Sequence, residues 1–302
     1  MTDAPSYQTE FDALPGMAVT IAPAITRVTA PNASAYTFTG TNSFILGENS
    51  VFILDPGPDD PAHFAALEAA IAGRKVKAII LTHTHRDHSA LAPRLSQAMQ
   101  APLWFGGEHR LSRPLRLFEV NPFARSGHYG LMPDRKLDDG EILEADGIVL
   151  EAIATPGHCA NHFAFSVRGT PYLFSGDHVM GWNSTLVAAP DGALAPYLES
   201  LDRLIARSER LYLPGHGGPI ENGPAQAKAL KAHRLMRNGQ ILEAIADGSK
   251  TLAAISTRMY PHLKGRIGIA ARYTVAAHLD YLKALGKLDF LRTPFGTRVW
   301  LS

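Results

Sequence analysis

LTHTHRDH, residues 81–88, is the most informative stretch of this 302-residue chain, because it places three histidines and an aspartate within one turn. It follows the apolar run Val76–Leu81, which predicts a buried strand. In open α/β layers the ligand site lies at the carboxyl ends of such strands. Imidazole and carboxylate groups together suit zinc and related metals, whereas calcium and magnesium prefer oxygen ligands alone. The stretch therefore predicts the first half of a two-metal site.

Three later motifs repeat this arrangement, in which an apolar strand leads into a glycine-containing turn and then a potential metal ligand. They are Thr155–His158, Ser175–His178 and Leu213–Gly217. Glycine permits backbone turns that a side chain would strain. Motifs of one kind at several strand ends predict side chains that point into one crevice. They supply the further histidines and the bridging carboxylate that a pair of metals needs.

Together these motifs resemble the metallo-β-lactamase fold superfamily, over about the first three quarters of the chain. The resemblance implies a four-layer αββα sandwich, whereas periodicity alone supports only a mixed α/β class. It also implies seven metal ligands. These are His83, His85 and His158 for one metal, Asp87, His88 and His216 for the other, and Asp177 as the bridge. Asp55, in ILDPG at 53–57, matches a position that orients ligand histidines without binding metal.

The resemblance implies a hydrolase with two zinc ions, with manganese or iron as alternatives because these ligands do not discriminate sharply. In such sites a hydroxide that bridges the metals is the nucleophile, since metal binding lowers the pKa of water toward ~7. Asp87 is predicted to orient this hydroxide. True zinc β-lactamases have a cysteine ligand where this chain has Asp177, so we expect a different substrate.

Four other positions are candidates for proton transfer or substrate binding. His162 is a candidate general acid because it lies near a ligand in sequence, and the alternative is a histidine buried behind the ligands. The resemblance alone suggests substrate binding by Asn183, Ser184 and Thr185.

Composition predicts an ordinary globular protein, with 46% hydrophobic residues, 19% charged residues and a formal net charge of +1. The single cysteine, Cys159, excludes an intrachain disulfide and favours a reducing compartment. Cys159 is an alternative ligand or nucleophile, although a two-metal site needs no thiol. Residues 1–5 include an acidic group and no basic leader, and no apolar run is long enough to span a membrane. We therefore expect a cytoplasmic protein without a membrane segment.

The C-terminal part differs from the rest in charge. Residues 225–302 contain 13 Lys and Arg against 4 Asp and Glu, a net charge of +9, and the remaining 16 basic and 24 acidic residues give −8. We therefore divide the chain into a catalytic domain at 1–224 and a basic domain at 225–302. This asymmetry indicates contact with polyanions, and a helical surface that neutralises the acidic domain is an equal alternative.

Helical patterns in the basic domain lie at Ile241–Ile245, at Leu252–Met259 behind the cap Thr251, and at Val275–Leu285, and a hairpin follows at 288–301. Three helices and a hairpin resemble a winged-helix module. This module after such a catalytic domain resembles the branch that contains β-lactamase-like protein 2, a ribonuclease acting on single-stranded RNA, and fungal polyketide-releasing thioesterases. HCANH at 158–162 also matches that branch, with Asn161 in place of its usual aspartate.

Elsewhere, the alternating residues of Val19–Ile21 and Tyr36–Phe38 predict antiparallel strands, and 61–73 and 90–99 predict helices. Residues 110–134 alternate basic and aromatic side chains. A flap beside the cleft and a plain surface loop explain that segment equally well.

Three functions are therefore in competition. A two-metal hydrolase of single-stranded RNA accounts for both the ligands and the basic domain. A hydrolase of a small acyl thioester, lactone or other ester accounts for the ligands and treats the C-terminal domain as a lid. A non-catalytic nucleic-acid regulator accounts only for the basic domain, and buried histidines and aspartates in such numbers are costly without metal.

Overall fold

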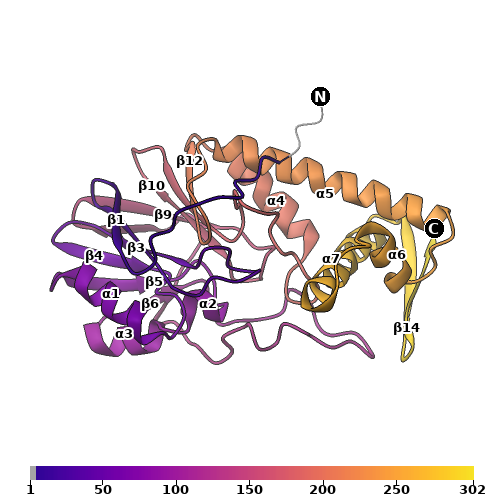
Figure 1. The fold of residues 1–302 in the computed structure, drawn as a ribbon, viewed down its shortest axis with the longest axis horizontal. Coiled ribbons are helices and arrows are strands. Elements are labelled where there is room, and N and C mark those ends of the chain that lie inside the picture. The colour runs from indigo at the N-terminus through magenta and orange to yellow at the C-terminus, as the bar shows by residue number, and fades with distance from the viewer. Residues whose placement is uncertain (1–4) are drawn as a thin grey trace.

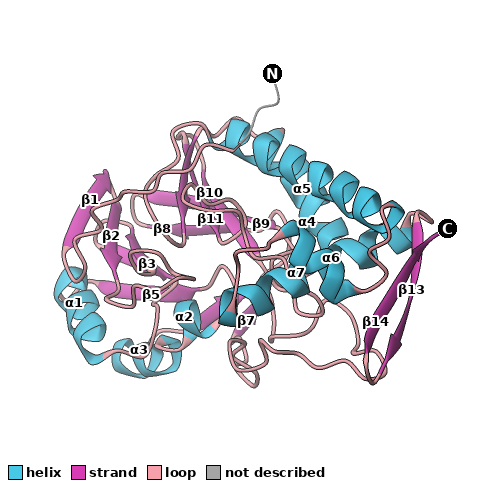
Figure 2. Cartoon of the chain, turned by 45° about the vertical axis from the view of Figure 1, so that its right-hand side comes forward, coloured by secondary structure: helices cyan, strands magenta, loops and turns pink. Residues whose placement is uncertain are grey.

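The computed structural model describes residues 5–302 of the chain. The first four residues, on which the predicted absence of a leader partly depends, lie outside the described part. Two β-sheets pack face to face, and helices cover both outer faces (Figures 1 and 2). The predicted four-layer αββα sandwich is confirmed. Within residues 5–302, no helix combines the length and the apolar character needed to cross a bilayer.

The first sheet holds its seven strands in chain order. They are β1 (Ala18–Ala22), β2 (Ile25–Thr29), β3 (Asn42–Leu46), β4 (Ser50–Leu54), β5 (Lys75–Ile80), β6 (Leu103–Phe105) and β7 (Arg135–Lys136). β1 to β4 pair antiparallel, whereas β4, β5 and β6 run parallel. Because parallel strands end at the same edge, Asp55 after β4 lies beside the histidine-rich stretch after β5.

The second sheet has five strands in the order β12-β11-β10-β9-β8. Their bounds are β8 (Ile142–Ala145), β9 (Ile148–Ala154), β10 (Phe163–Val167), β11 (Tyr172–Gly176) and β12 (Leu211–Pro214). β9 and β11 are both antiparallel to β10, and β12 is parallel to β11. The residues that follow β9, β11 and β12 therefore emerge at one edge, which is the edge that carries His158, Asp177 and His216.

The helices are α1 (Pro61–Ile71), α2 (Arg86–Ser89), α3 (Ala92–Met99), α4 (Leu194–Ile205), α5 (Gly223–Ala246), α6 (Leu252–Met259) and α7 (Gly265–Ala284). A hairpin of β13 (Leu288–Thr293) and β14 (Gly296–Leu301) follows them. α1 begins where the Asp60 carboxylate accepts a hydrogen bond from the backbone N–H of His63 at 2.8 Å, and it ends at the left-handed residue Ala72. α1 and α3 agree with the helices predicted at 61–73 and 90–99.

Three apolar cores hold the layers together. Between the sheets, the buried rings of Phe44 and Phe174 pack with their centroids 4.8 Å apart. Leu67 of α1 and Leu95 of α3 cover the outer face of the first sheet. The third core lies over the second sheet and includes the fully buried Tyr197 of α4.

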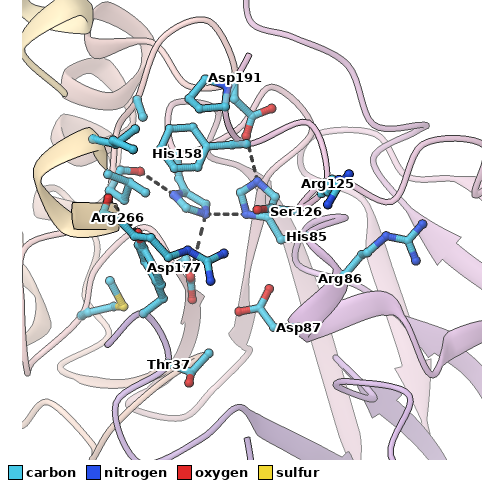
Figure 3. Close-up of a pocket in the computed structure, with 17 residues that line it drawn as sticks. Thr37, His85, Arg86, Asp87, Arg125, Ser126, His158, Asp177, Asp191 and Arg266 are labelled. Atoms are coloured by element: carbon cyan, nitrogen blue, oxygen red, sulfur yellow. Dashed lines mark hydrogen bonds and ion pairs between the residues drawn. The ribbon is translucent and has the colours of Figure 1, made fainter. Parts of the chain in front are cut away.

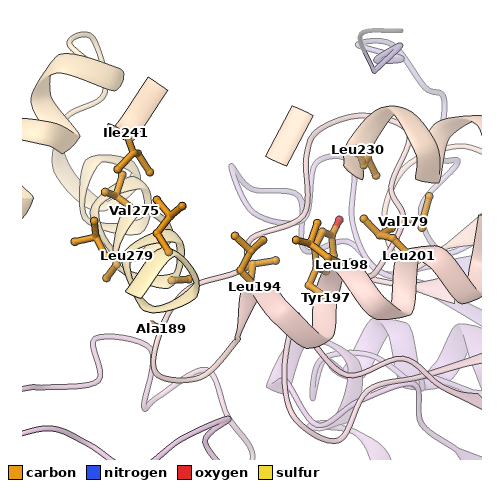
Figure 4. Close-up of a cluster of buried hydrophobic side chains, with 14 of the residues drawn as sticks. Val179, Ala189, Leu194, Tyr197, Leu198, Leu201, Leu230, Ile241, Val275 and Leu279 are labelled. Atoms are coloured by element: carbon orange, nitrogen blue, oxygen red, sulfur yellow. The ribbon is translucent and has the colours of Figure 1, made fainter. Parts of the chain in front are cut away.

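The C-terminal elements share this third core with the sandwich. It contains Leu198 of α4, Leu230 and Ile241 of α5, and Val275 of α7 (Figure 4). α5 begins at Gly223, so the boundary predicted between 224 and 225 falls inside its first turn. The helix predicted near Ile241 is the end of α5, whereas α6 and the hairpin match their predicted ranges. Their assignment as a winged helix stays a prediction.

The strand predicted at Tyr36–Phe38 is wrong, because these residues form a turn. The Ser34 hydroxyl accepts hydrogen bonds from the backbone N–H groups of Tyr36 and Thr37, at 3.1 and 3.2 Å. Phe38 has a positive φ of 52°, and its ring stacks on Trp182 at 5.0 Å. Hydroxyl side chains that bond to nearby backbone compete with strand pairing, which the alternating pattern does not reveal. The turn brings Tyr36 and Thr37 to the cleft described below.

His63 is expected to make stability depend on pH. It is fully buried, with its Nε2 2.9 Å from the Ser43 hydroxyl. Burial lowers the pKa of His63 to about 4, whereas an unfolded histidine titrates near 6.5. The unfolded state therefore binds more protons below pH 6.5, and stability is lost as pH falls from there toward 4.

Replacing His63 by glutamine removes this titration and keeps a side chain that can bond to Ser43. From pH 7 to pH 5, we expect the free energy of unfolding of His63→Gln to fall by about 2 kcal/mol less than that of the parent chain. Urea denaturation at both pH values measures the two losses, with a chelator present so that metal release does not contribute. Equal losses in the two proteins would contradict the expectation.

Candidate metal centre

Five histidines and two aspartates meet at the shared strand edge. Two groups of potential ligands each keep their ligand atoms within 4.8 Å of one another. They are His83, His85 and His158, and Asp87, His88 and His216. The structure thus brings these six residues together in the two groups that the sequence resemblance implies.

Three ring nitrogens of the first group face a common point. His85 Nδ1 is 3.1 Å from His83 Nε2 and 2.9 Å from His158 Nε2. A neutral imidazole has one nitrogen that donates and one that accepts, so three accepting nitrogens this close repel each other unless a proton or cation lies between them. In the second group, His88 Nε2 and His216 Nε2 are 3.2 Å apart.

Each of these five histidines also has an oxygen acceptor at its other ring nitrogen. The pairs are His83 Nδ1 with Thr82 Oγ1 (2.9 Å), His85 Nε2 with Asp191 Oδ2 (2.8 Å), His158 Nδ1 with the Leu186 carbonyl (2.7 Å), His88 Nδ1 with Asp55 Oδ2 (2.9 Å) and His216 Nδ1 with the Gly40 carbonyl (3.2 Å). Because the acceptor holds the ring proton on the outer nitrogen, the inner nitrogen keeps its lone pair for a cation.

Asp177 lies between the two groups. Its Oδ1 is 3.4 Å from His88 Nε2, and its Oδ2 is 3.4 Å from His216 Nε2 and 3.8 Å from His158 Nε2. The carboxylate is buried, and Oδ1 has no hydrogen-bond partner within residues 5–302. A buried carboxylate oxygen is costly without a partner, and a cation in each group would supply one. The residues present therefore fit a pair of cations bridged by Asp177.

Two of the histidines are neutral without metal, whereas the facing carboxylates outweigh burial and raise the pKa of His85, His88 and His216, the last to about 9, so a cation would displace a proton from each of these three rings. Burial lowers the pKa of His83 well below its ordinary value, and burial together with His85 lowers the pKa of His158 to about 4. Both rings are therefore neutral near pH 7. Burial would raise the pKa of Asp177, but the facing imidazoles, His216 foremost, hold it well below its usual range. Asp177 is thus ionised and can bridge two cations.

Asp55 supports the centre from behind. It accepts hydrogen bonds from the backbone N–H and the hydroxyl of Thr82, at 2.7 and 2.6 Å, as well as from His88. One carboxylate therefore fixes both a ligand of the second group and the backbone that precedes His83. These contacts suit the orienting role that the resemblance implies for Asp55, which stays a prediction.

His162 lies behind the bridging carboxylate. Its Nδ1 is 2.8 Å from the Thr155 hydroxyl, and its Nε2 accepts a hydrogen bond from the backbone N–H of Asp177 at 3.1 Å. Burial, reinforced by the neighbouring His178, lowers the pKa of His162 well below its ordinary value. Both ring nitrogens are occupied, so this geometry favours the positioning of Asp177 over the general-acid role suggested by the sequence.

The three candidate substrate residues, Asn183, Ser184 and Thr185, are not among the residues that line the cleft described below. Thr185 is buried and donates its hydroxyl hydrogen to the His178 carbonyl at 3.0 Å, and Asn183 accepts from the backbone N–H of Ser184 at 2.8 Å. Cys159 is also buried, and burial raises the pKa of its thiol well above the ordinary value. The thiol therefore stays protonated and is a poor nucleophile.

A cavity of about 640 Å³ opens over the centre. His85, Asp87, His158 and Asp177 form its floor (Figure 3). The walls combine apolar side chains with three arginines. They are Pro122, Phe123, Met180, Leu186, Ala188 and Ile269, with Arg86, Arg125 and Arg266. Part of residues 110–134 therefore lies beside the cleft, as the flap interpretation requires.

Asp191 is a part of the site that sequence reasoning missed. Its Oδ2 contacts His85 Nε2 at 2.8 Å and its Oδ1 contacts His109 Nε2 at 3.0 Å. His109 in turn lies 3.0 Å from the Thr84 hydroxyl through Nδ1. One carboxylate thus orients a ligand of the first group and ties it to the segment after β6. The Pro-Asp-Gly turn at 190–192 carries no sequence signal for this role.

The fold and the site together define a metal-dependent hydrolase. More particularly, residues 36–216 match the Metallo-beta-lactamase superfamily, and the chain belongs to that superfamily.

Its relatives include both kinds of protein that the sequence analysis named for one branch of the superfamily. A beta-lactamase-like protein 2 homolog from Caenorhabditis elegans is 26% identical over 288 residues, which cover 92% of this chain and 90% of that protein. Atrochrysone carboxyl ACP thioesterase AgnL7 from Paecilomyces divaricatus is 29% identical over 231 residues, covering 74% of this chain and 65% of that protein.

Solved structures agree with the fold over almost the whole chain. A beta-lactamase domain protein from Burkholderia ambifaria has a TM-score of 0.80 at 22% identity, covering 96% of each chain. A metallo-beta-lactamase family protein from Thermus thermophilus has a TM-score of 0.76 at 28% identity, covering 94% of this chain and 100% of that chain. Because these matches extend past residue 216, the C-terminal elements recur with the sandwich.

Proposed function

We propose that this protein hydrolyses a thioester, or a related ester, of a small acyl compound with two bound zinc ions. The observation that carries this proposal is the cavity of about 640 Å³ over the centre, whose walls include Phe123, Leu186 and Ile269. An apolar pocket of this size accommodates a small organic substrate. The thioesterase relative, at 29% identity, supports the same substrate class.

The contacts of the basic C-terminal residues favour this proposal over RNA cleavage. Four of the 13 basic residues are paired with carboxylates in the described part of the chain. The pairs are Lys231 with Asp202 (2.5 Å), Arg258 with Asp247 (2.5 Å), Lys283 with Asp289 (2.5 Å) and Arg292 with Glu119 (3.1 Å). Arg234 is buried and donates to the Thr185 carbonyl. Asp202 and Glu119 lie outside residues 225–302 and offset part of the +9 charge, as the alternative interpretation expects, whereas Asp247 and Asp289 are already counted in it.

Bound metals would supply a Lewis acid for the substrate oxygen and an activated water as nucleophile. Side chains of the protein would orient the attacking water. Asp87 lines the cleft, and its Oδ2 is 3.3 Å from His216 Nε2. Burial would raise the pKa of Asp87, but His88 and then His216 lower it, so this carboxylate is ionised and can accept a hydrogen bond from the attacking water. The outward-facing acceptors hold each ring proton on the outer nitrogen and leave the inner nitrogen free to hold a metal.

The leaving group also favours a thioester. His162, the one histidine suggested as a general acid, has both ring nitrogens occupied. A thiol has a pKa of about 8.5 and departs as a thiolate without help, whereas the alkoxide of a phosphodiester is far more basic and benefits from a proton donor. With both nitrogens of His162 occupied, thioester hydrolysis, whose leaving group needs no proton donor, suits this site better than phosphodiester cleavage.

The test compares thioesterase and ribonuclease activity in the same zinc-loaded preparation of the full chain. We expect turnover of a short acyl thioester that is lost on chelation and restored by zinc, with RNA left intact. Salt dependence gives a second criterion, because binding to single-stranded RNA weakens with a log–log slope of about −0.7 for each phosphate contact. Zinc-dependent, salt-sensitive RNA cleavage without thioester turnover would contradict the proposal.

A further inference from the structure

We propose that Arg86, Arg125 and Arg266 form an anion-binding rim that selects thioesters with a phosphate or carboxylate group away from the scissile bond. This inference rests on the proposed function for the bond that is cleaved, but the recognition of the anion does not depend on it. The rim would determine specificity, whereas the metal centre would carry the reaction.

The three arginines reach the cleft from separate parts of the chain. Arg86 begins α2, Arg125 lies in the segment between β6 and β7, and Arg266 is in the first turn of α7. In Figure 3, Arg266 extends toward the site from one side, and Arg86 and Arg125 lie on the opposite side. Local sequence alone does not explain this convergence, because the three segments are far apart along the chain.

Hydrogen bonds between backbone and neighbouring segments hold the rim in place. The backbone N–H of Arg86 donates to the Ser126 carbonyl at 2.8 Å, which ties the segments that carry Arg86 and Arg125. On the other side, the Tyr36 hydroxyl donates to the Arg266 carbonyl at 3.2 Å. The arginine side chains are exposed and free to move, but they are anchored around one opening.

The rim arginines lack the carboxylate partners that several other arginines of this protein have. Arg113, for example, is 2.5 Å from a Glu119 oxygen, and Arg207 is 2.9 Å from a Glu151 oxygen. In the described part of the chain, none of the three rim guanidinium groups lies within 4.0 Å of a carboxylate oxygen. A guanidinium is a planar fork that matches phosphate and carboxylate oxygens. The rim therefore offers three such forks without an internal partner.

The acidic residues of the cleft do not neutralise the rim. Asp87 and Asp177 face the ligand histidines, and Asp191 contacts both His85 and His109. α7 also begins without an acidic residue in its first turn, so its positive end adds to the field beside Arg266. Positive charge at the opening with an apolar wall below it fits a ligand that has an apolar body and an anionic end.

The anion has two possible sources in a thioester. It can be a phosphate on the thiol side, as in coenzyme A, or a carboxylate on the acyl side, as in a dicarboxylic acid. Both present oxygens that an arginine fork binds, so the rim defines the shared chemistry and a substrate series identifies the source.

The test uses three thioesters: butyryl-phosphopantetheine, butyryl-pantetheine, which lacks the phosphate, and succinyl-pantetheine, which adds a carboxylate to an acyl chain of equal length. Arg266→Gln and Arg125→Gln are compared with Arg168→Gln, which removes an exposed arginine outside the cleft. For the preferred anionic substrate, we expect each rim variant to lower kcat/KM about tenfold or more through KM, the effect of a lost charge-assisted hydrogen bond. For butyryl-pantetheine, kcat/KM of the rim variants should change less than about twofold, and so should kcat/KM of the Arg168→Gln control for every substrate.

Direct binding separates the rim from the proposed function. Calorimetry with free coenzyme A and with succinate, each alone, should show binding of one anion that weakens in Arg266→Gln and not in Arg168→Gln. Rim-dependent binding without turnover of any thioester would support the rim and refute the proposed function. Equal losses on charged and uncharged substrates, or rim-independent binding of both anions, would overturn the rim. Rim-dependent binding of RNA without binding of either small anion would overturn it as a selector of thioesters.

Discussion

Asp177→Ala is expected to lower the metal content from about two ions per chain to about one or fewer, and kcat/KM by about a thousandfold or more. The reason is the position of Asp177 between both groups, 3.4 Å from His88 Nε2 and from His216 Nε2 and 3.8 Å from His158 Nε2. Alanine removes the negative charge that would offset two adjacent cations, and Asp55, which also lies near both groups, is already bound to Thr82 and His88.

Elemental analysis and kinetics of the same preparations measure both effects. Asp138→Ala is the matched control, because Asp138 is exposed and lies outside the cleft. Asp177→Asn should fall between the parent and the alanine variant, since the amide keeps one oxygen ligand and loses the charge. An alanine variant that retains both ions and its activity would refute the bridging role.

Much of the centre could be predicted because local sequence encodes it. A β-branched or aliphatic run followed by a glycine turn and a histidine determines where a side chain leaves a strand, and parallel neighbours bring those ends to one edge. His158, Asp177 and His216 each follow a strand and a glycine, whereas His83 follows the end of β5 without a glycine. The order of the four layers came from the family resemblance, because the periodicity of a strand does not tell which sheet it joins.

Asp191 and the convergence of the rim arginines could not be predicted from the sequence, because loop packing places them. Only the flap interpretation of residues 110–134 placed Arg125 near the cleft. Asp191 is 106 residues from His85 along the chain, and its turn looks like any other Pro-Asp-Gly turn. Arg266 was part of a positive sum over 78 residues, 225–302. That sum does not show which arginines find carboxylates, such as Arg292 beside Glu119, and which line a cleft. Charge counted along a sequence is therefore a poor guide to charge at a surface.

The same limit applies to the division into domains. The change in charge after residue 224 is real, but α5 runs through it from Gly223 to Ala246. Its buried residues Leu230 and Ile241 join α4 and α7 in one core. The charge boundary therefore does not coincide with a packing boundary. The C-terminal part closes one side of the cleft with Arg266 and Ile269, as the thioester hypothesis expects of a lid.

Gly215→Ala is expected to disrupt both halves of the centre with one methyl group. A Cβ at Gly215 would lie 2.6 Å from Asp177 Oδ1 and 2.6 Å from His88 Cε1. The backbone there is fixed, because the N–H of Gly215 donates to the Gly176 carbonyl at 2.9 Å and the carbonyl of Gly215 accepts from Asn42 at 2.8 Å. His88 is also held by Asp55, so the bridging carboxylate and a ligand must both move.

Displacement of ligands in this way should reduce metal affinity or kcat/KM by about a hundredfold or more. Mutation of residues that only hydrogen-bond to metal ligands already lowers affinity or activity by about 10- to 100-fold. Gly239→Ala in α5 is the matched control, because a Cβ there meets nothing within 4 Å. That control should keep full metal content and gain about 1 kcal/mol of stability from better helix propensity. If Gly215→Ala binds metal and turns over substrate as well as Gly239→Ala does, then Asp177 and His88 are not held as tightly as these contacts require.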